Sequence, residues 1–186
     1  MMRLLIFIIL FVTGGNPDDV KFYLTNHGNI SFRSEAQQEI INAASNKMVG
    51  IIDVQNRTFV FKVSIRSFNG FNSALQQEHF NEKYLESEKY PEAYFTGKII
   101  EDLDLSINGN YDLRAKGKLN IHGVDMERII RGKANVSNGK IDIESHFRIS
   151  LSDHNIKIPK VVHEKIASEI IVDLKAELIR KDQVEK

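Results

Sequence analysis

Long stretches that alternate between apolar and polar residues are the feature that most limits what this chain can fold into. Apolar residues occupy every second position through most of residues 58–68, 112–122, 140–152 and 168–180. Successive side chains of a β-strand point to opposite faces, so this period predicts an antiparallel sheet with one buried and one solvated face. The sequence therefore predicts a mainly β protein.

Shorter strand patterns and turn signals complete the sheet. Turn residues at 55–57, 108–110 and 137–139 are typical of hairpins between neighbouring strands. Long antiparallel strands with one apolar face can form a sandwich or a closed barrel, and the strand length favours the barrel. We expect one domain, an antiparallel β-barrel of about eight strands. The additional strands are expected at residues 20–25, 30–34, 39–43, 48–54, 94–100 and 127–135.

One segment has a helical pattern instead. Residues 71–85 place apolar side chains at the spacing of one helix face, and Tyr90-Pro91 ends the helix before the next strand. A helix at this place is expected to cover the barrel mouth as a lid. A second, short helix is expected over residues 161–167, before the last strand. In the lid, Leu75, Phe80 and Leu85 are expected to close the mouth, and Gln76, Glu78 and Lys83 to face water.

The N-terminus indicates export. Arg3 precedes an uninterrupted apolar run from Leu4 to Val12, and Gly15 offers a small residue for cleavage. The run is shorter than the roughly 20 residues of a membrane-spanning helix. We expect residues 1–15 to be a signal peptide and 16–186 to be the periplasmic or secreted domain; a retained N-terminal anchor is the alternative. The chain has no cysteine, so neither a disulfide framework nor a lipid-modified cysteine is available.

Charge and motifs exclude several classes of function. The 25 basic and 25 acidic residues cancel and are scattered, which is unlike the basic patch of a nucleic-acid-binding protein. The sequence contains no Gly-x-Ser-x-Gly, no His-Glu-x-x-His and no phosphate-binding glycine loop. Its six histidines are dispersed without the spacing of metal ligands. We expect a protein that is not an enzyme and that has no metal, no cofactor and no nucleic-acid partner.

The inward positions mix large and small residues, and small ones such as Ala115, Gly117 and Ala176 leave space for a cavity. An apolar tube of this kind suits an amphiphilic lipid, such as an isoprenoid or fatty-acyl chain. A structural or stress-related interaction protein with a filled barrel is the alternative. His79 is expected either to bind a lipid head group or only to space the lid helix. The predicted lining is Phe59, Phe61, Val63, Ile65, Phe95, Leu119, Ile121, Ile143, Phe147 and Ile149.

Three motifs resemble those of the YceI-like family. Residues 71–95 contain His79-Phe80, then Tyr90-Pro91; residues 119–124 form a strand ending in His-Gly-Val; and residues 149–159 precede the short helix and the final strand. The resemblance implies an exported or periplasmic lipocalin-like barrel that binds polyisoprenoid or other long lipids, without enzymatic activity. A homodimer is common in families of this kind.

Many members of this family carry an Arg-Asp pair just before the lid histidine. This chain has Gln76 and Gln77 there. The difference removes a charged contact to a phosphate head group and favours a neutral or different lipid.

Overall fold

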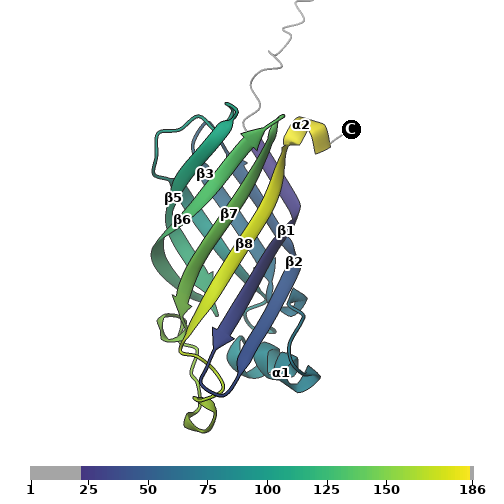
Figure 1. The fold of residues 1–186 in the computed structure, drawn as a ribbon, viewed down its shortest axis with the longest axis vertical. Helices are drawn as coiled ribbons and strands as arrows, with labels where there is room; N and C mark the ends of the chain where they lie inside the picture. Colours follow the sequence, from purple (N-terminus) through teal and green to yellow (C-terminus); the bar gives the residue numbers. More distant parts are fainter. Residues whose placement is uncertain (1–21, 185–186) are drawn as a thin grey trace, which may run out of the picture.

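The computed structural model describes residues 22–184, which form a closed barrel of eight antiparallel strands (Figure 1). The strands follow one another around the barrel in chain order, and the last pairs with the first. The predicted eight-stranded antiparallel barrel is confirmed. The strands are β1 (Phe22–Glu35), β2 (Ile40–Asp53), β3 (Thr58–Ser64), β4 (Glu92–Ile99), β5 (Gly109–Ile121), β6 (Val124–Ser137), β7 (Lys140–Ser150) and β8 (Glu169–Arg180).

The predicted signal peptide at residues 1–15 and the first two residues of the expected strand at 20–25 lie outside the described residues. None of the helices within residues 22–184 has the length and apolar character needed to cross a membrane.

The first two strands are longer than the sequence predicts, because each absorbs two of the expected short strands. Polar residues 26–29 form no turn; the ladder between β1 and β2 shifts register there, with Gly28 opposite Met48. Such a shift is a β-bulge, in which extra residues bend a strand without ending it. Asn26 and His27 are exposed at this bulge, while Thr25 and Gly28 on either side are buried.

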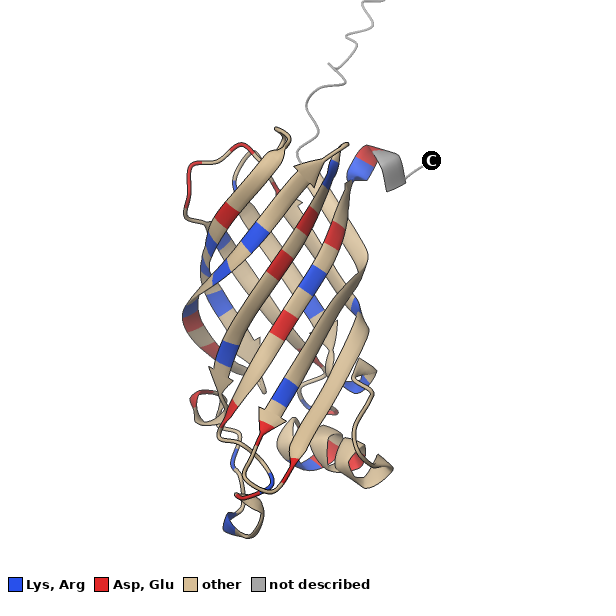
Figure 2. Ribbon diagram, in the orientation of Figure 1, with Lys and Arg blue, Asp and Glu red and all other residues tan. Residues whose placement is uncertain are grey.

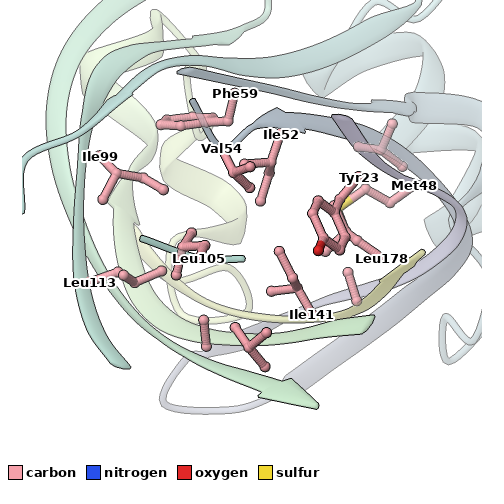
Figure 3. Packing of buried hydrophobic residues seen from close by; sticks show 14 of the residues in the cluster. Tyr23, Met48, Ile52, Val54, Phe59, Ile99, Leu105, Leu113, Ile141 and Leu178 are labelled. Carbon is pink, nitrogen blue, oxygen red and sulfur yellow. The ribbon is translucent and has the colours of Figure 1, made fainter. Parts of the chain in front are cut away.

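One end of the barrel is filled by side chains (Figure 3). Leu105, in the loop between β4 and β5, folds into this end and is only 2% exposed. Inward-facing residues of the strands pack around Leu105. Together these apolar side chains close this end of the tube, and we call them the plug. The packed residues at this end include Tyr23, Met48, Ile52, Val54, Leu113, Ile141 and Leu178.

The opposite end carries α1 (Ala74–His79), followed directly by the π-helical turn η2 (Phe80–Tyr84), near the bottom of Figure 1. The lid helix expected over residues 71–85 is therefore wrong in extent. Ser73 caps α1 by accepting a hydrogen bond from the Gln76 backbone N–H at 3.2 Å, which sets the start of the helix. The wider turn closes with a hydrogen bond from the Leu85 N–H to the Phe80 carbonyl at 2.9 Å.

Short helical turns occupy most of the remaining connections. The helix expected over residues 161–167 is a single 3-10 turn over Lys160–Val162, followed by a hydrogen-bonded turn over residues 163–165. Its backbone is held by the barrel rim, because the Ala167 N–H donates to the Ser34 hydroxyl at 2.9 Å. A short helix after the last strand was not expected. These elements are η1 (Ile65–Ser67), η3 (Leu151–His154), η4 (Lys160–Val162) and α2 (Lys181–Val184).

The barrel wall is incomplete between β6 and β7 at the lid end. The ladder between these strands runs from Ser137–Lys140 to Gly132–Ser145 and ends there. In the described chain, residues 124–131 of β6 and 146–150 of β7 continue without pairing to each other; we call these two segments the β6–β7 seam. Arg128 bridges it: its guanidinium donates to the Arg148 carbonyl at 2.7 Å and lies 3.6 Å from the Asp153 carboxylate.

The outer face of the barrel is charged, with both signs interspersed along the strands (Figure 2). Ion pairs join neighbouring strands across this face, and exposed pairs of this kind contribute about 0.2–1 kcal/mol each to stability. The alternation seen in the sequence therefore separates this charged face from an apolar interior. The pairs are Lys62–Glu92, Lys140–Glu177, Glu144–Lys175 and Arg148–Glu169.

Candidate functional site

An apolar cavity of about 430 Å³ lies inside the barrel between the plug and the lid. Its wall is built from the inward-facing side chains of the strands, since period-two alternation brings every second residue to the interior. The volume lies within the range of roughly 300–1,000 Å³ that is usual for small-molecule sites. The barrel is therefore neither filled throughout nor an open pore.

The residues predicted to line or close the interior border this cavity, with one exception. Leu75 lies on the solvent side of α1 and is 57% exposed. Because the helix begins at Ala74, Leu75 in its first turn points outward. Gln76, which was expected to face water, borders the cavity instead. The predicted residues at the cavity are Phe59, Phe61, Val63, Ile65, His79, Phe80, Leu85, Phe95, Leu119, Ile121, Ile143, Phe147 and Ile149.

Four phenylalanine rings gather where the lid meets the barrel. The Phe80 ring stacks on Phe32 of β1 with centroids 5.3 Å apart, and lies 5.0 Å from Phe71 and 5.8 Å from Phe68. Ring pairs at these separations contribute about 0.5–1.5 kcal/mol beyond their buried area. The sequence analysis missed Phe32 and Phe68, although Phe32 continues the inward alternation of its strand.

A second apolar cluster attaches the end of the lid to the barrel rim. Leu85 is 8% exposed and packs with Ile65, Leu151 and Ile156. These residues come from segments far apart in the sequence: the ends of β3 and β7 and the loop before β8. The lid therefore rests on packed side chains at two places, and the cavity lies behind them.

Polar side chains border the cavity beside the lid. The Gln76 amide donates to the Glu39 carboxylate at 2.6 Å, which ties α1 to the turn between β1 and β2. The Lys83 ammonium lies 2.9 Å from His79 Nε2. Because an ammonium group can only donate hydrogen bonds, Lys83 is the donor and His79 Nε2 the acceptor. The His79 proton is then on Nδ1, where it can be donated. Both interpretations of His79, head-group ligand and helix spacer, fit this arrangement.

A hydrogen-bonded histidine, which the sequence analysis did not select, links the lid to the β5–β6 turn. His122 Nε2 lies 2.5 Å from the Glu86 carboxylate, and its Nδ1 lies 3.1 Å from the His154 carbonyl. Each ring nitrogen of His122 therefore faces an oxygen that can accept a hydrogen bond. These two contacts connect the chain just after the lid to the far side of the barrel rim.

The same contact region requires a glycine. Gly123 has a φ of +72°, and a Cβ atom there would lie 2.3 Å from the Tyr90 ring. The Tyr90 ring packs edge-on against His122 with centroids 4.7 Å apart. The Tyr90-Pro91 helix stop and the His-Gly-Val turn, distant in the sequence, thus form one contact that holds the lid segment in place.

His154 is fully buried beneath this contact. Its Nδ1 donates to the Val124 carbonyl at 3.2 Å, while Nε2 has no hydrogen-bond partner among the described residues. Burial lowers the pKa of the imidazole below its ordinary value, so the ring is neutral where an exposed histidine would begin to take up a proton.

Within residues 22–184, no three His, Asp or Glu side chains gather in a way that could hold a metal ion. The candidate site is therefore the apolar cavity itself, with its polar rim beside the lid.

Solved structures share this architecture at low sequence identity. A polyisoprenoid-binding domain from Saccharophagus degradans, implicated in plant cell wall breakdown, has a TM-score of 0.73 and 13% identity, covering 87% of this chain and 99% of that one. BcnA from Burkholderia cenocepacia has a TM-score of 0.65 and 16% identity, covering 81% and 95%. A YceI protein from Campylobacter jejuni has a TM-score of 0.54 and 14% identity, covering 95% and 97%.

A comparison with curated proteins finds no match. The model of the YceI-like domain matches residues 23–178, from the first described strand to the last. The motifs that resemble this family lie at the lid, at the β5–β6 turn and before β8, and the structure brings the first two into contact. The chain belongs to the YceI-like domain family.

Proposed function

We propose that this protein binds an amphiphilic lipid, an isoprenoid or fatty-acyl chain, inside the barrel. The observation that carries the proposal is the apolar cavity of about 430 Å³, closed at one end by packed side chains. The resemblance of the fold to a polyisoprenoid-binding domain supports a long apolar ligand.

Burial of an apolar chain in the cavity is the main source of free energy for the proposed binding. Each buried methylene contributes about 0.8 kcal/mol, so a chain of about ten carbons contributes about 8 kcal/mol. Association costs about 4–15 kcal/mol in lost freedom, and a chain much shorter than this would bind weakly. Affinity therefore comes from the length of chain buried, and Gln76, Glu39 and His79 beside the lid orient the head group.

We propose carriage or sequestration and not catalysis. The walls of the cavity are apolar, and titratable side chains such as Glu39, His79 and Lys165 border it beside the lid. A reaction on a buried chain would require an acid or base deep in the tube, whereas a head group at the mouth needs only hydrogen bonds.

Native mass spectrometry tests the proposal. Protein purified from its own cell envelope should carry one lipid per chain, and Ala115→Phe, which fills the cavity from β5, should lose it. Leu75→Phe adds a ring on the solvent side of α1 and is the matched control, which should retain the lipid. If no small molecule accompanies the wild type and none binds after delipidation, lipid binding is wrong and the filled-barrel alternative gains support.

We also propose that the protein is exported, since Arg3 and the apolar run to Val12 are typical of a signal peptide. N-terminal sequencing of the protein from fractionated cells should find a chain that begins at Asn16, in the periplasmic or secreted fraction. An intact Met1 on protein from the cytoplasm would contradict export, and an intact Met1 in the membrane fraction would favour the retained anchor.

A further inference from the structure

The outer wall of the barrel does not share its charges evenly between the strands. On β7 and β8 cations lie opposite anions, as in the pairs Lys140–Glu177 and Glu144–Lys175. On β4, β5 and β6 basic residues gather instead, and Figure 2 shows basic residues close together on the side of the barrel formed by β5 and β6. We call this group the basic face; it consists of Lys98, Arg114, Lys116, Lys118, Arg131 and Lys133.

Two pairs within the basic face place like charges directly opposite each other. Lys98 of β4 is the register partner of Lys116 of β5, and Arg114 of β5 is the partner of Arg131 of β6. Side chains at such positions have Cβ atoms about 4.5–5.5 Å apart, and like charges there destabilise a sheet. The arrangement therefore costs the folded chain stability, and an anionic partner outside the chain would offset this cost.

Acidic side chains of the chain itself do not neutralise the basic face. Within residues 22–184, Arg114 is the one member that has an ion-pair partner, the Glu101 carboxylate at 2.6 Å. Asp112 and Glu127 are the register partners of Lys133 and Lys118, but neither carboxylate forms an ion pair within the described residues. Five of the six cations are therefore available to an external anion.

An exposed apolar side chain stands in the middle of the basic face. Ile129 of β6 is the register partner of Lys116 and is 57% exposed. Proteins that lie on a membrane surface combine cations, which contact anionic head groups, with apolar side chains that enter the boundary of the acyl region. A soluble acidic partner would use the cations alone, so the position of Ile129 favours a membrane.

The basic face also adjoins the β6–β7 seam. Arg131 is the last residue of β6 before the ladder with β7 begins at Gly132, and both residues border the cavity. The wall that would meet a bilayer therefore lies beside the part of the barrel that is closed by side chains. The interior in which we propose lipid binding lies directly behind it.

We propose that the basic face is a docking surface for an anionic lipid bilayer. Each Lys or Arg held near an anionic surface strengthens binding about fivefold. Burial of the exposed part of Ile129 adds about a further tenfold. Salt screens the charged contribution, over about 10 Å at 0.1 M, so docking is reversible and depends on ionic strength. The proposal concerns the outer wall and does not require a lipid inside the barrel.

Co-sedimentation with vesicles tests the proposal. The purified protein should bind vesicles made of phosphatidylcholine and phosphatidylglycerol in equal amounts, should not bind vesicles of phosphatidylcholine alone, and should dissociate as the salt concentration rises. Lys98→Gln combined with Lys116→Gln should lower the affinity for anionic vesicles about 25-fold. Because this double variant removes a like-charge pair, its melting temperature should not fall.

The matched control is Lys47→Gln combined with Lys175→Gln, on β2 and β8. It changes the net charge equally but lies outside the basic face, so it should bind anionic vesicles as the wild type does. Ile129→Ser leaves the net charge unchanged and should weaken vesicle binding about tenfold, without changing the binding of polyglutamate, a soluble polyanion.

Circular dichroism and thermal unfolding identify which variants are folded. A folded wild type that does not bind anionic vesicles, or an equal loss of affinity in the two double variants, overturns the docking surface. Polyglutamate binding as tight as vesicle binding, with no effect of Ile129→Ser on either, overturns it in favour of an acidic protein partner. Lipid retention in native mass spectrometry is measured separately, so the proposed function and the docking surface can fail independently.

Discussion

At the scale of single residues, position in the barrel matters more than residue type. His79 and His122 are both partly buried histidines near the lid, but only the His122 ring has an acceptor beside each of its two nitrogens. The sequence predicted a role for His79 from its place in a helical pattern. It could not identify His122 in the same way, because its partners Glu86 and His154 are each more than thirty residues away along the chain.

The buried histidine makes stability depend on pH. Burial lowers the pKa of His154, so as the pH falls below about 6.5 the unfolded chain takes up a proton that the folded ring does not. The unfolded state then binds more protons, and the free energy of unfolding should fall between about pH 7 and pH 5. His154→Asn keeps an N–H donor near Nδ1 and cannot titrate, so its unfolding free energy should fall less over this range.

Urea unfolding of both proteins at each pH measures this difference. The titratable and charged neighbours of the ring, which are Glu86, His122, Arg128 and Asp153, are present in both proteins, so their contributions cancel in the comparison. If the unfolding free energies of the two proteins change with pH in parallel, His154 does not contribute to the pH dependence of stability.

Gly123 offers a second test at this scale. Gly123→Ala places a Cβ atom 2.3 Å from the Tyr90 ring at a positive φ, so the turn or the ring must move. We expect a loss of about 1–3 kcal/mol in unfolding free energy, the usual cost of a strained backbone position. Gly109→Ala is the control, since the atoms nearest to its Cβ belong to the Tyr111 side chain and the shortest of these distances is 3.2 Å. Equal unfolding free energies for the two variants would contradict the contact described here.

At the scale of elements, the alternation predicted the faces of β3, β5, β7 and β8 because that pattern is local. It could not distinguish a turn from a bulge at residues 26–29, since both use polar residues and glycine. The same limit explains Leu75: which side of a helix faces the barrel depends on where the helix begins, and the Ser73 cap decides this. Most of the cavity lining was predictable, therefore, whereas the lid was predictable only in outline.

The lid should matter more for holding the ligand than for folding. Phe80→Ala removes the ring that joins Phe32, Phe68 and Phe71 at the mouth, and lipid retention should weaken by about 1–3 kcal/mol. Its cost in unfolding free energy should be smaller than that of Phe59→Ala, which empties a buried site on a strand and should cost about 3–5 kcal/mol. Lipid retention and thermal unfolding of both variants decide this; equal destabilisation with unchanged retention per folded molecule would make the lid part of the core.

At the scale of the whole molecule, the ligand should complete the core. A lipid that binds only the folded state adds about 2.7 kcal/mol of stability at a hundred times its dissociation constant. For a chain of this size each kcal/mol shifts the melting temperature by about 2–4 °C, so complete delipidation should lower it by roughly 5–10 °C. Differential scanning calorimetry before and after delipidation, with the lipid then added back, measures the shift. Identical transitions in all three samples would mean that the cavity is not part of the stabilising core.

The β6–β7 seam gives the two ends of the molecule different mechanical properties. At the closed end, a continuous backbone ladder and the packed plug resist widening. At the lid end, the circumference between residues 124–131 and 146–150 is closed by side chains, with the Arg128 guanidinium spanning the gap to Arg148. Side-chain hydrogen bonds lengthen more readily than a backbone ladder. The barrel should therefore widen more easily at the lid end than at the closed end. If the proposed lipid binds, the seam is the part of the wall expected to spread around a bulky head group or a methyl-branched chain.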